Sequence, residues 1–154
     1  MKTPSDWLAK YYPEPASEAA KRSWVDALEH SIRKWTGFRP KELDKFGLAK
    51  PPGLFLAELK SLDRVAVEGR TSWMGATAGT CALCQREDIT SDPEGEGCRG
   101  CPLYIVRGAP CYGPLRVGRR SPYHAFVDGS DPEPMLRLLR SARKIAKKLD
   151  KEGK

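Results

Sequence analysis

Apolar side chains recur at intervals of three and four residues in the first third of the chain, which is the period of one helical face. They predict a long helix that runs from Ser17, a suitable N-cap, to about Trp35 or Thr36, with Gly37 just beyond its end. The expected buried face carries Val25, Leu28, Ile32 and Trp35, and the expected polar face carries Arg22, Asp26, Glu29, His30 and Arg33. The acid-first pair at Glu29 and Arg33 has the favourable i,i+4 order.

Two shorter helices flank this one in the predicted N-terminal part, residues 1–50. Residues 5–12 place four apolar side chains on one side before two prolines end the pattern. Residues 40–46 begin with a proline and stop before a glycine. Residues 51–77 are read as a connecting segment.

A last amphipathic helix is predicted from Asp131 to about Leu149, within a basic C-terminal part, residues 131–154. Its expected apolar positions are Met135, Leu138, Leu139, Ala142, Ile145, Ala146 and Leu149. Arginine and lysine cover much of the remaining surface. We therefore expect one face to pack on the protein and the other to lie in solvent.

Residues 78–130 lack this periodicity and are rich in glycine, proline and cysteine. The runs at 103–106 and 123–127 are the only strand-like segments here. We expect a small α+β fold, with a helical N-terminal part, an irregular zinc-knuckle or ribbon-like cysteine module, and the C-terminal helix. Its 154 residues indicate one compact domain overall.

The net charge of +7 is concentrated at the two ends of the chain. Residues 1–50 contribute +3 and residues 131–154 contribute +4, whereas the segment between them is balanced. A basic surface favours polyanion partners such as nucleic acid. The plainer interpretation is a solvated face that only keeps the chain soluble.

The first residues, MKTPSDWLAKYY, contain no apolar run, so we expect no signal peptide. No segment has the length of apolar residues that a membrane span requires, and no membrane partner is expected. These features predict a reducing, cytoplasmic location, where disulfides are rare. The odd count of five cysteines also disfavours a disulfide framework.

The cysteines form two pairs, each with two residues between its members, and one further thiol. The pairs are Cys81 with Cys84 and Cys98 with Cys101, and Cys111 follows. Two such pairs are typical of a closed four-thiolate zinc site. Buried inert cysteines are the alternative, but single cysteines fit that description better than two pairs in an apolar-poor segment.

The choice of metal and of the fourth ligand stays open at this point. Four cysteines also suit an iron–sulfur cluster, and the proline after Cys101 occurs in cluster motifs. Cys111 or His124 is a candidate replacement for one of the four paired thiols. A histidine in a strand-like run is more often structural.

An enzyme is the class with the least support. A nucleophile and base pair formed by Cys111 and His124 lacks any visible third group or oxyanion hole. The chain also has no phosphate-binding loop, no HExxH and no GxSxG motif.

Nucleic-acid contacts are predicted in two regions. Residues 98–127 contain no acidic side chain and carry five arginines, three of which lie near aromatic rings that stack on bases or simply pack the cysteine module. The candidate residues are Arg116, Arg119 and Arg120 in this region, and Arg140, Arg143, Lys144, Lys147 and Lys148 in the C-terminal helix.

The runs CALC, GCRGCPLY, GAPCYG and SPYHAF resemble a cysteine-rich segment of small bacteriophage and prophage proteins. LEHSIRKWTGF and LDKFGL are similar to the N-terminal part of the same proteins, so the likeness covers about two-thirds of the chain. The resemblance implies a phage or prophage origin and metal binding at the five cysteines, but no activity.

Two non-enzymatic functions follow from these features. The first is an accessory protein that contacts nucleic acid or a nucleic-acid machine. The second is an adaptor or inhibitor that docks on a host protein through its aromatic N-terminal segment or its basic C-terminal helix. The sequence does not define an oligomeric state.

Overall fold

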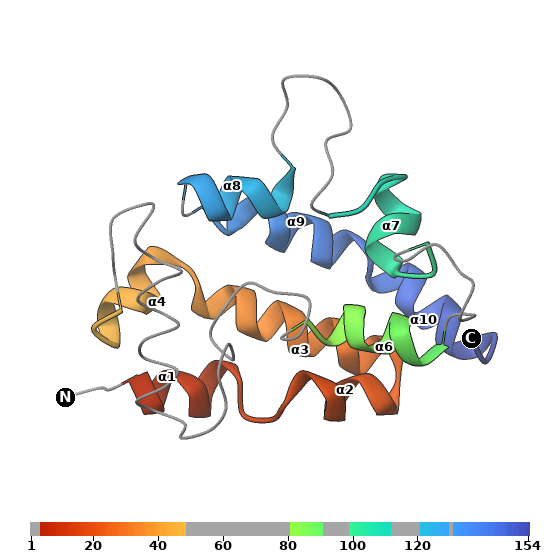
Figure 1. The fold of residues 1–154 in the computed structure, drawn as a ribbon, viewed down its shortest axis with the longest axis horizontal. Helices are drawn as coiled ribbons and strands as arrows, with labels where there is room; N and C mark the ends of the chain where they lie inside the picture. The colour runs from red at the N-terminus through yellow and green to blue at the C-terminus, as the bar shows by residue number, and fades with distance from the viewer. Residues whose placement is uncertain (1–3, 49–80, 91–98, 112–120, 130) are drawn as a thin grey trace.

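The computed structural model describes residues 4–48, 81–90, 99–111, 121–129 and 131–154, and each regular element in these ranges is a helix (Figure 1). The helical prediction is thereby confirmed, whereas the predicted strand content is not found in the described ranges. None of the described helices combines the length and apolar content needed to cross a membrane.

The N-terminal part contains three helices in place of the two predicted up to Gly37. They are α1 (Pro4–Tyr11), α2 (Ala16–Arg22) and α3 (Trp24–Gly37). The break lies at Ser23, whose backbone is extended (φ −168°, ψ 168°) and whose hydroxyl accepts a hydrogen bond from the Asp26 amide at 3.0 Å. A serine that caps a new helix competes with continuation of the old one, so the single predicted helix is divided.

The predicted buried face of α3 is largely confirmed, and its polar face is confirmed except at His30, since Arg22, Glu29 and Arg33 are exposed. Leu28, Ile32 and Trp35 are buried and Val25 is half-buried. His30, expected in solvent, is also buried, because the chain between α1 and α2 folds over it. One ring nitrogen lies 2.9 Å from the carbonyl oxygen of Glu14.

The predicted ion pair between Glu29 and Arg33 is replaced by contacts to other elements. Glu29 accepts a hydrogen bond from Arg143 at 2.9 Å, and the Arg33 guanidinium donates to the carbonyl oxygen of Lys10 at 2.5 Å. A pair within one helix is worth only a few tenths of a kcal/mol, so tertiary partners readily displace it.

Helix α4 (Pro40–Lys45) confirms the prediction for residues 40–46. Gly47, with φ 71°, ends this region in the left-handed conformation that favours glycine. Leu43 and Phe46 are buried as expected. They join an aromatic core in which Phe38 stacks on Phe126 with 4.9 Å between ring centroids.

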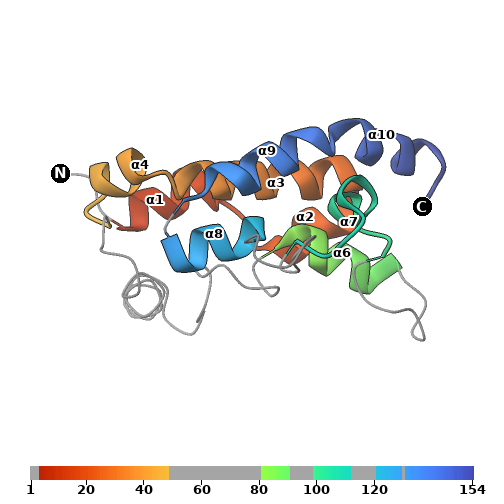
Figure 2. The same ribbon diagram turned by 90° about the horizontal axis from the view of Figure 1, so that it is seen from above.

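The C-terminal helix is divided at Ala142 into α9 (Glu133–Ser141) and α10 (Arg143–Lys151), which follow one another beside α3 (Figure 2). Three contacts fix an antiparallel arrangement with α3. They are Arg39 to Glu133 at 2.7 Å, Arg143 to Glu29 at 2.9 Å, and the Asp150 carboxylate to the backbone amides of Trp24 and Val25 at 2.7 and 3.0 Å. Met135, Leu139, Ala142 and Ala146 are buried as predicted, whereas Leu138 and Ile145 are only half-buried and Leu136, absent from the prediction, is fully buried.

The described parts of the cysteine module are helical and not irregular. They contain α6 (Ala82–Thr90), α7 (Pro102–Arg107) and α8 (Pro122–Gly129). The two runs interpreted as strands, 103–106 and 123–127, lie within α7 and α8. A proline begins each of these two helices, and a glycine lies at or just after its end. These helix start and stop signals outweigh the β-propensity of the short apolar runs.

Candidate metal centre

Cys81 and Cys84 lie at the start of α6, which packs against α2 and α3. The Cys81 carbonyl accepts the first helical hydrogen bond, from the Gln85 amide at 3.0 Å. Residues three apart at a helix start lie on one face, so the two thiols are adjacent and share a hydrogen bond. The first predicted pair is therefore held in one helical turn.

Cys101 and Cys111 flank the second short helix. Cys101 occupies the N-cap position of α7 and accepts through its carbonyl from the Ile105 amide at 3.1 Å. At the other end, Gly108 (φ 76°) turns the chain, and its amide donates to the Tyr104 carbonyl at 2.6 Å. Cys111 follows this turn, so a single helix and its flanking residues place two further thiols in the wall of one cavity.

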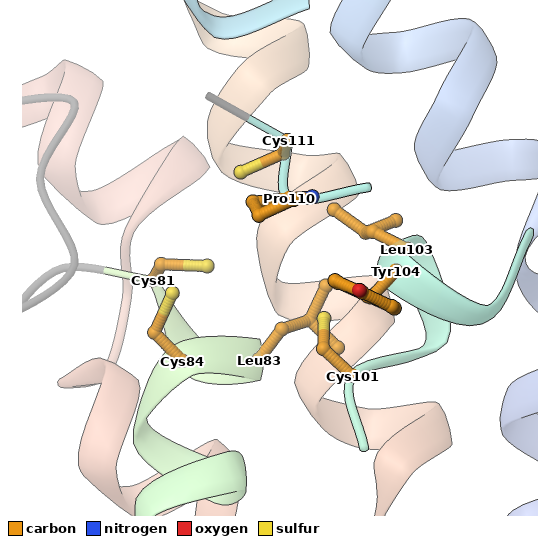
Figure 3. A pocket seen from close by; sticks show the side chains of 8 residues that line it. All are labelled: Cys81, Leu83, Cys84, Cys101, Leu103, Tyr104, Pro110 and Cys111. Carbon is orange, nitrogen blue, oxygen red and sulfur yellow. The ribbon is translucent and has the colours of Figure 1, made fainter. Parts of the chain in front are cut away.

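These four cysteines line one small cavity between α6 and α7. Its volume is about 20 Å³, and Leu83, Leu103, Tyr104 and Pro110 complete the described part of its wall. Figure 3 shows Cys81 and Cys84 together on one side, with Cys101 and Cys111 contributed by the other chain segment. Two separate stretches of sequence thus bring four thiols to one cavity.

The donor set does not by itself select the bound group. Zinc accepts four thiolates in a tetrahedral set, and iron–sulfur clusters are also held by cysteine thiolates. The four cysteines that line the cavity therefore fit zinc, and metal analysis separates zinc from a cluster.

The four thiols line the same cavity, but they are not arranged around one point as the ligands of an ion would be. Among the described residues, no three His, Cys, Asp or Glu side chains already form a metal-ligand group. Zinc–sulfur bonds of about 2.3 Å require sulfurs about 3.8 Å apart. Metal binding at this place therefore requires the side chains of α6 and α7 to approach each other.

The electrostatics of the cavity disfavour several free thiolates. The hydrogen bond from Cys84 lowers the pKa of Cys81, and the same bond raises the pKa of Cys84. Burial raises the pKa of the Cys101 thiol. The first pair therefore shares one proton, and full ionisation of the site requires a bound cation.

Helix α3 supplies a second layer of polar groups behind the first pair. The Ser31 hydroxyl lies 4.0 Å from the Cys81 sulfur. Lys34, with only 2% of its surface exposed, interacts electrostatically with Cys81 and Cys84. Burial lowers the pKa of Lys34 to about 8, and the two cysteines oppose that shift.

Sequence reasoning did not single out Lys34, although a signal was present. Ala27, Ser31, Lys34 and Phe38 follow the four-three-four spacing of one helical face, and all four are buried. A lysine in such a row contradicts the amphipathic pattern and marks a position that needs an explanation.

Glu87 of α6 contacts the chain segment that carries Cys101. Its buried carboxylate accepts a hydrogen bond from the Gly100 amide at 3.0 Å. A Cβ atom at Gly100 would lie 2.5 Å from a Glu87 carboxylate oxygen, so a side chain there would displace the carboxylate from this contact. This contact sets the approach of Cys101 to the first thiol pair.

Other predicted site residues lie elsewhere. His124 is exposed at the start of α8, where Ser121 Oγ lies 2.7 Å from its Nδ1, and it is not among the residues that line the cavity. Cys98, Arg116, Arg119 and Arg120 lie outside the described residues, so their predicted roles stay predictions.

No protein-family model matches the chain, and no curated protein or solved structure matches it either. The functional interpretation therefore depends on the site itself.

Two of the predicted basic residues of the C-terminal helix lie close to carboxylates. Arg143 is paired with Glu29 at 2.9 Å, and Lys148 lies 4.0 Å from Glu152. Five other cations recur at intervals of three and four residues, are exposed, and form no ion pair with a carboxylate of the described ranges. They are Arg137, Arg140, Lys144, Lys147 and Lys151, and we call them the basic stripe.

Proposed function

We propose that the protein is a non-catalytic, zinc-binding accessory protein of phage or bacterial origin that contacts the nucleic-acid backbone through the basic stripe. In this proposal the zinc ion stabilises the fold of the cysteine module. The proposed location is the cytoplasm.

The zinc part of the proposal is supported by the convergence of thiols. Cys81, Cys84 and Cys101 would bind the ion together with either Cys98 or Cys111. When bound, the ion supplies a positive charge and four bond directions that hold the thiol-bearing segments together. The described cavity wall contains no histidine or carboxylate that could act as a general base, which favours a structural role over a catalytic one.

The nucleic-acid part is carried by one observation, the regular stripe of exposed cations on α9 and α10, which form no ion pair with a carboxylate of the described ranges. At 1.5 Å per helical residue, neighbouring cations are about 5 Å apart along the axis and the stripe extends over about 21 Å. That length is sufficient for several successive phosphates of one strand.

The anchoring of α9 and α10 strengthens this interpretation. Glu133, Arg143 and Asp150 tie the two helices to α3, so the side facing the protein is fixed. The cations of the stripe are therefore displayed on a rigid support. Such contacts bind backbone without reading base sequence.

The test is fluorescence anisotropy with labelled single-stranded and duplex DNA and RNA across a salt series. Replacing Arg140, Lys144 and Lys147 with glutamine should weaken binding to every sequence alike. It should also reduce the slope of log affinity against log salt by about three, one for each lost phosphate contact.

The matched control replaces Lys21, Arg22 and Lys45 with glutamine. It removes the same net charge, but these cations pair with carboxylates, at 3.2 Å from Glu18, 2.9 Å from Asp26 and 2.9 Å from Glu42 respectively. Its affinity and salt slope should stay within about twofold of the wild type. No binding by the wild type at micromolar protein and low salt, or an equal loss in the control, contradicts the proposal.

A protein partner is the second candidate, and one observation favours it. Ile105 and Val106 on α7 are 44% and 39% exposed, next to the cysteine cavity. The aromatic N-terminal segment does not serve as the docking element, because Trp7, Tyr11 and Tyr12 are buried in the core. Adaptor or inhibitor activity would then depend on α7 or on the basic C-terminal helices, and replacing Ile105 and Val106 with serine would abolish a salt-insensitive interaction.

A further inference from the structure

Lys34 is the only buried lysine or arginine in the described ranges. Its ammonium lies 5.8 Å from the centre of the Tyr12 ring and 5.7 Å from the centre of the Phe38 ring. Ring faces attract a cation only weakly, whereas removing an ammonium group from water is costly. A negative charge close to this side chain would offset part of that cost.

The thiol pair at the start of α6 is a source of that charge. Cys81 and Cys84 both interact electrostatically with Lys34, across the contact between α3 and α6. Ser31 lies three residues before Lys34 on the same helix and approaches Cys81. One face of α3 thus places a hydroxyl next to Cys81 and an ammonium group near both Cys81 and Cys84.

A zinc ion with four thiolates carries two net negative charges, because each thiolate contributes one and the ion offsets only two of the four. Such a charge is unfavourable in a low-dielectric interior unless a cation lies close by. An ammonium group close to two of the sulfurs lowers the net charge of the site.

We propose that Lys34 is the buried counter-charge of the thiolate centre, a positioning residue that increases its affinity for zinc without binding the ion. This inference rests on the proposed zinc site and adds a residue from outside the cysteine module to it. It also gives α3 a function besides packing, because the long N-terminal helix then forms the outer layer of the metal centre.

The test compares zinc affinity by competition with a chromogenic chelator. Lys34→Met keeps the length of the side chain and removes its charge, and it should weaken zinc binding about 10- to 100-fold. Lys34→Arg keeps the charge and should stay within about threefold of the wild type. Lys21→Met, which removes an exposed lysine from α2, is the matched control and should have no effect.

A spectroscopic readout separates charge compensation from simple loss of structure. The wild type and Lys34→Met are loaded to saturation with Co²⁺, and the sulfur-to-cobalt charge-transfer band is compared. Without the ammonium the sulfur lone pairs rise in energy, so the band should move to longer wavelength. A purely structural role of Lys34 would lower the affinity but leave the band of the saturated site in place.

The outcomes are distinguishable from failure of the zinc proposal. A wild type that binds neither Zn²⁺ nor Co²⁺ overturns the zinc centre and this inference together. A wild type that binds zinc, with equal affinity and an unshifted band in Lys34→Met, overturns only the role of Lys34. If Lys34→Met does not fold, the arginine variant decides: a folded Lys34→Arg protein with a tenfold loss of zinc affinity contradicts the proposal.

Discussion

At the scale of single residues, Cys98 and Cys111 are alternatives for one ligand position. The spacing of the pairs favours Cys98, and the structure places Cys111 in the wall of the cavity. Four thiolates complete a closed zinc site, so one of the five cysteines is dispensable for the metal.

We expect Cys84→Ser to abolish zinc binding and to unfold the cysteine module, because structural zinc contributes folding free energy. Of Cys98→Ser and Cys111→Ser, one should lose the metal and the other should keep one ion per chain. Metal analysis of the purified variants and their melting temperatures provide the measurement. Full zinc content in both of the latter variants would mean that the two cysteines replace one another, and full zinc content in the Cys98→Ser, Cys111→Ser double variant would rule out a four-thiolate centre.

A second residue-scale prediction concerns Glu42, whose carboxylate receives hydrogen bonds from Tyr11 and Lys45. These bonds lower the pKa of Glu42 to about 2, with the Tyr11 contribution the largest. A carboxyl group with a lowered folded-state pKa stabilises the protein above its unfolded pKa of about 4.3, and this stability is lost as the pH falls towards 2.

Glu42→Gln should therefore lower the melting temperature at pH 7, and the difference from the wild type should shrink steadily from about pH 4.3 to pH 2. Glu18→Gln, in which an exposed carboxylate on α2 is neutralised, is the control and should show little difference at any pH. A Glu42→Gln effect that stays constant down to pH 2 would show that packing, and not the charge, is responsible.

At the scale of elements, the start of α3 depends on a residue from the other end of the chain. The Asp150 carboxylate accepts hydrogen bonds from two amides in the first turn of α3, where the helix dipole favours a negative charge.

Asp150→Ala should cost roughly 1–3 kcal/mol of unfolding free energy, because it removes a charged cap and leaves two amides unpaired. Urea denaturation provides the measurement. Asp44→Ala, which removes an exposed carboxylate of α4, should change stability by less than about 0.5 kcal/mol. Equal small effects in both variants would show that the contact between Asp150 and α3 contributes nothing.

The helices with local start and stop signals could be predicted from the sequence. Helix α4 lies between Pro40 and Gly47, and the face of α3 follows from its spacing. The break at Ser23 could not be predicted, because the helical period continues across it and the contact that fixes the new start comes from Asp150. The short helices α7 and α8 were interpreted as strands because four or five apolar residues do not define a period.

The candidate site was predicted in part. The spacing of the cysteines located the thiols, and three cysteines of the predicted set, together with Cys111, line one cavity. Lys34 stands out by its place in a buried helical row, but that spacing does not say what the lysine contacts, which depends on how α3 packs against α6. Glu87 leaves no such signal, since its role depends on its contact with the Gly100 amide.

At the scale of the whole molecule, the two basic ends of the chain differ in how many of their cations form ion pairs. Many N-terminal cations are paired with nearby carboxylates, as Arg22 is with Glu14 and Asp26. The C-terminal helices keep five cations exposed, because their anchoring to α3 uses Glu133, Asp150 and Arg143 instead. Net charge alone therefore does not locate the proposed contact surface.

The same arrangement links the cysteine module to the proposed contact surface. Helix α7 packs on both α9 and α10, and α6 packs on α3, against which α9 and α10 also lie. A metal ion that holds α6 and α7 together would therefore also stabilise α9 and α10, the helices that carry the basic stripe. In this account the zinc centre and the stripe belong to one structural unit.

The central claim is that the cysteine cavity binds one zinc ion, and native mass spectrometry of the wild-type protein tests it most directly. The protein is purified without added metal or chelator, and its mass is compared before and after the cysteines are alkylated under denaturing conditions. The account predicts one zinc ion per chain that is lost on alkylation, with no visible absorbance in the starting protein. A chain that carries no metal, or one that carries iron with visible absorbance, contradicts it.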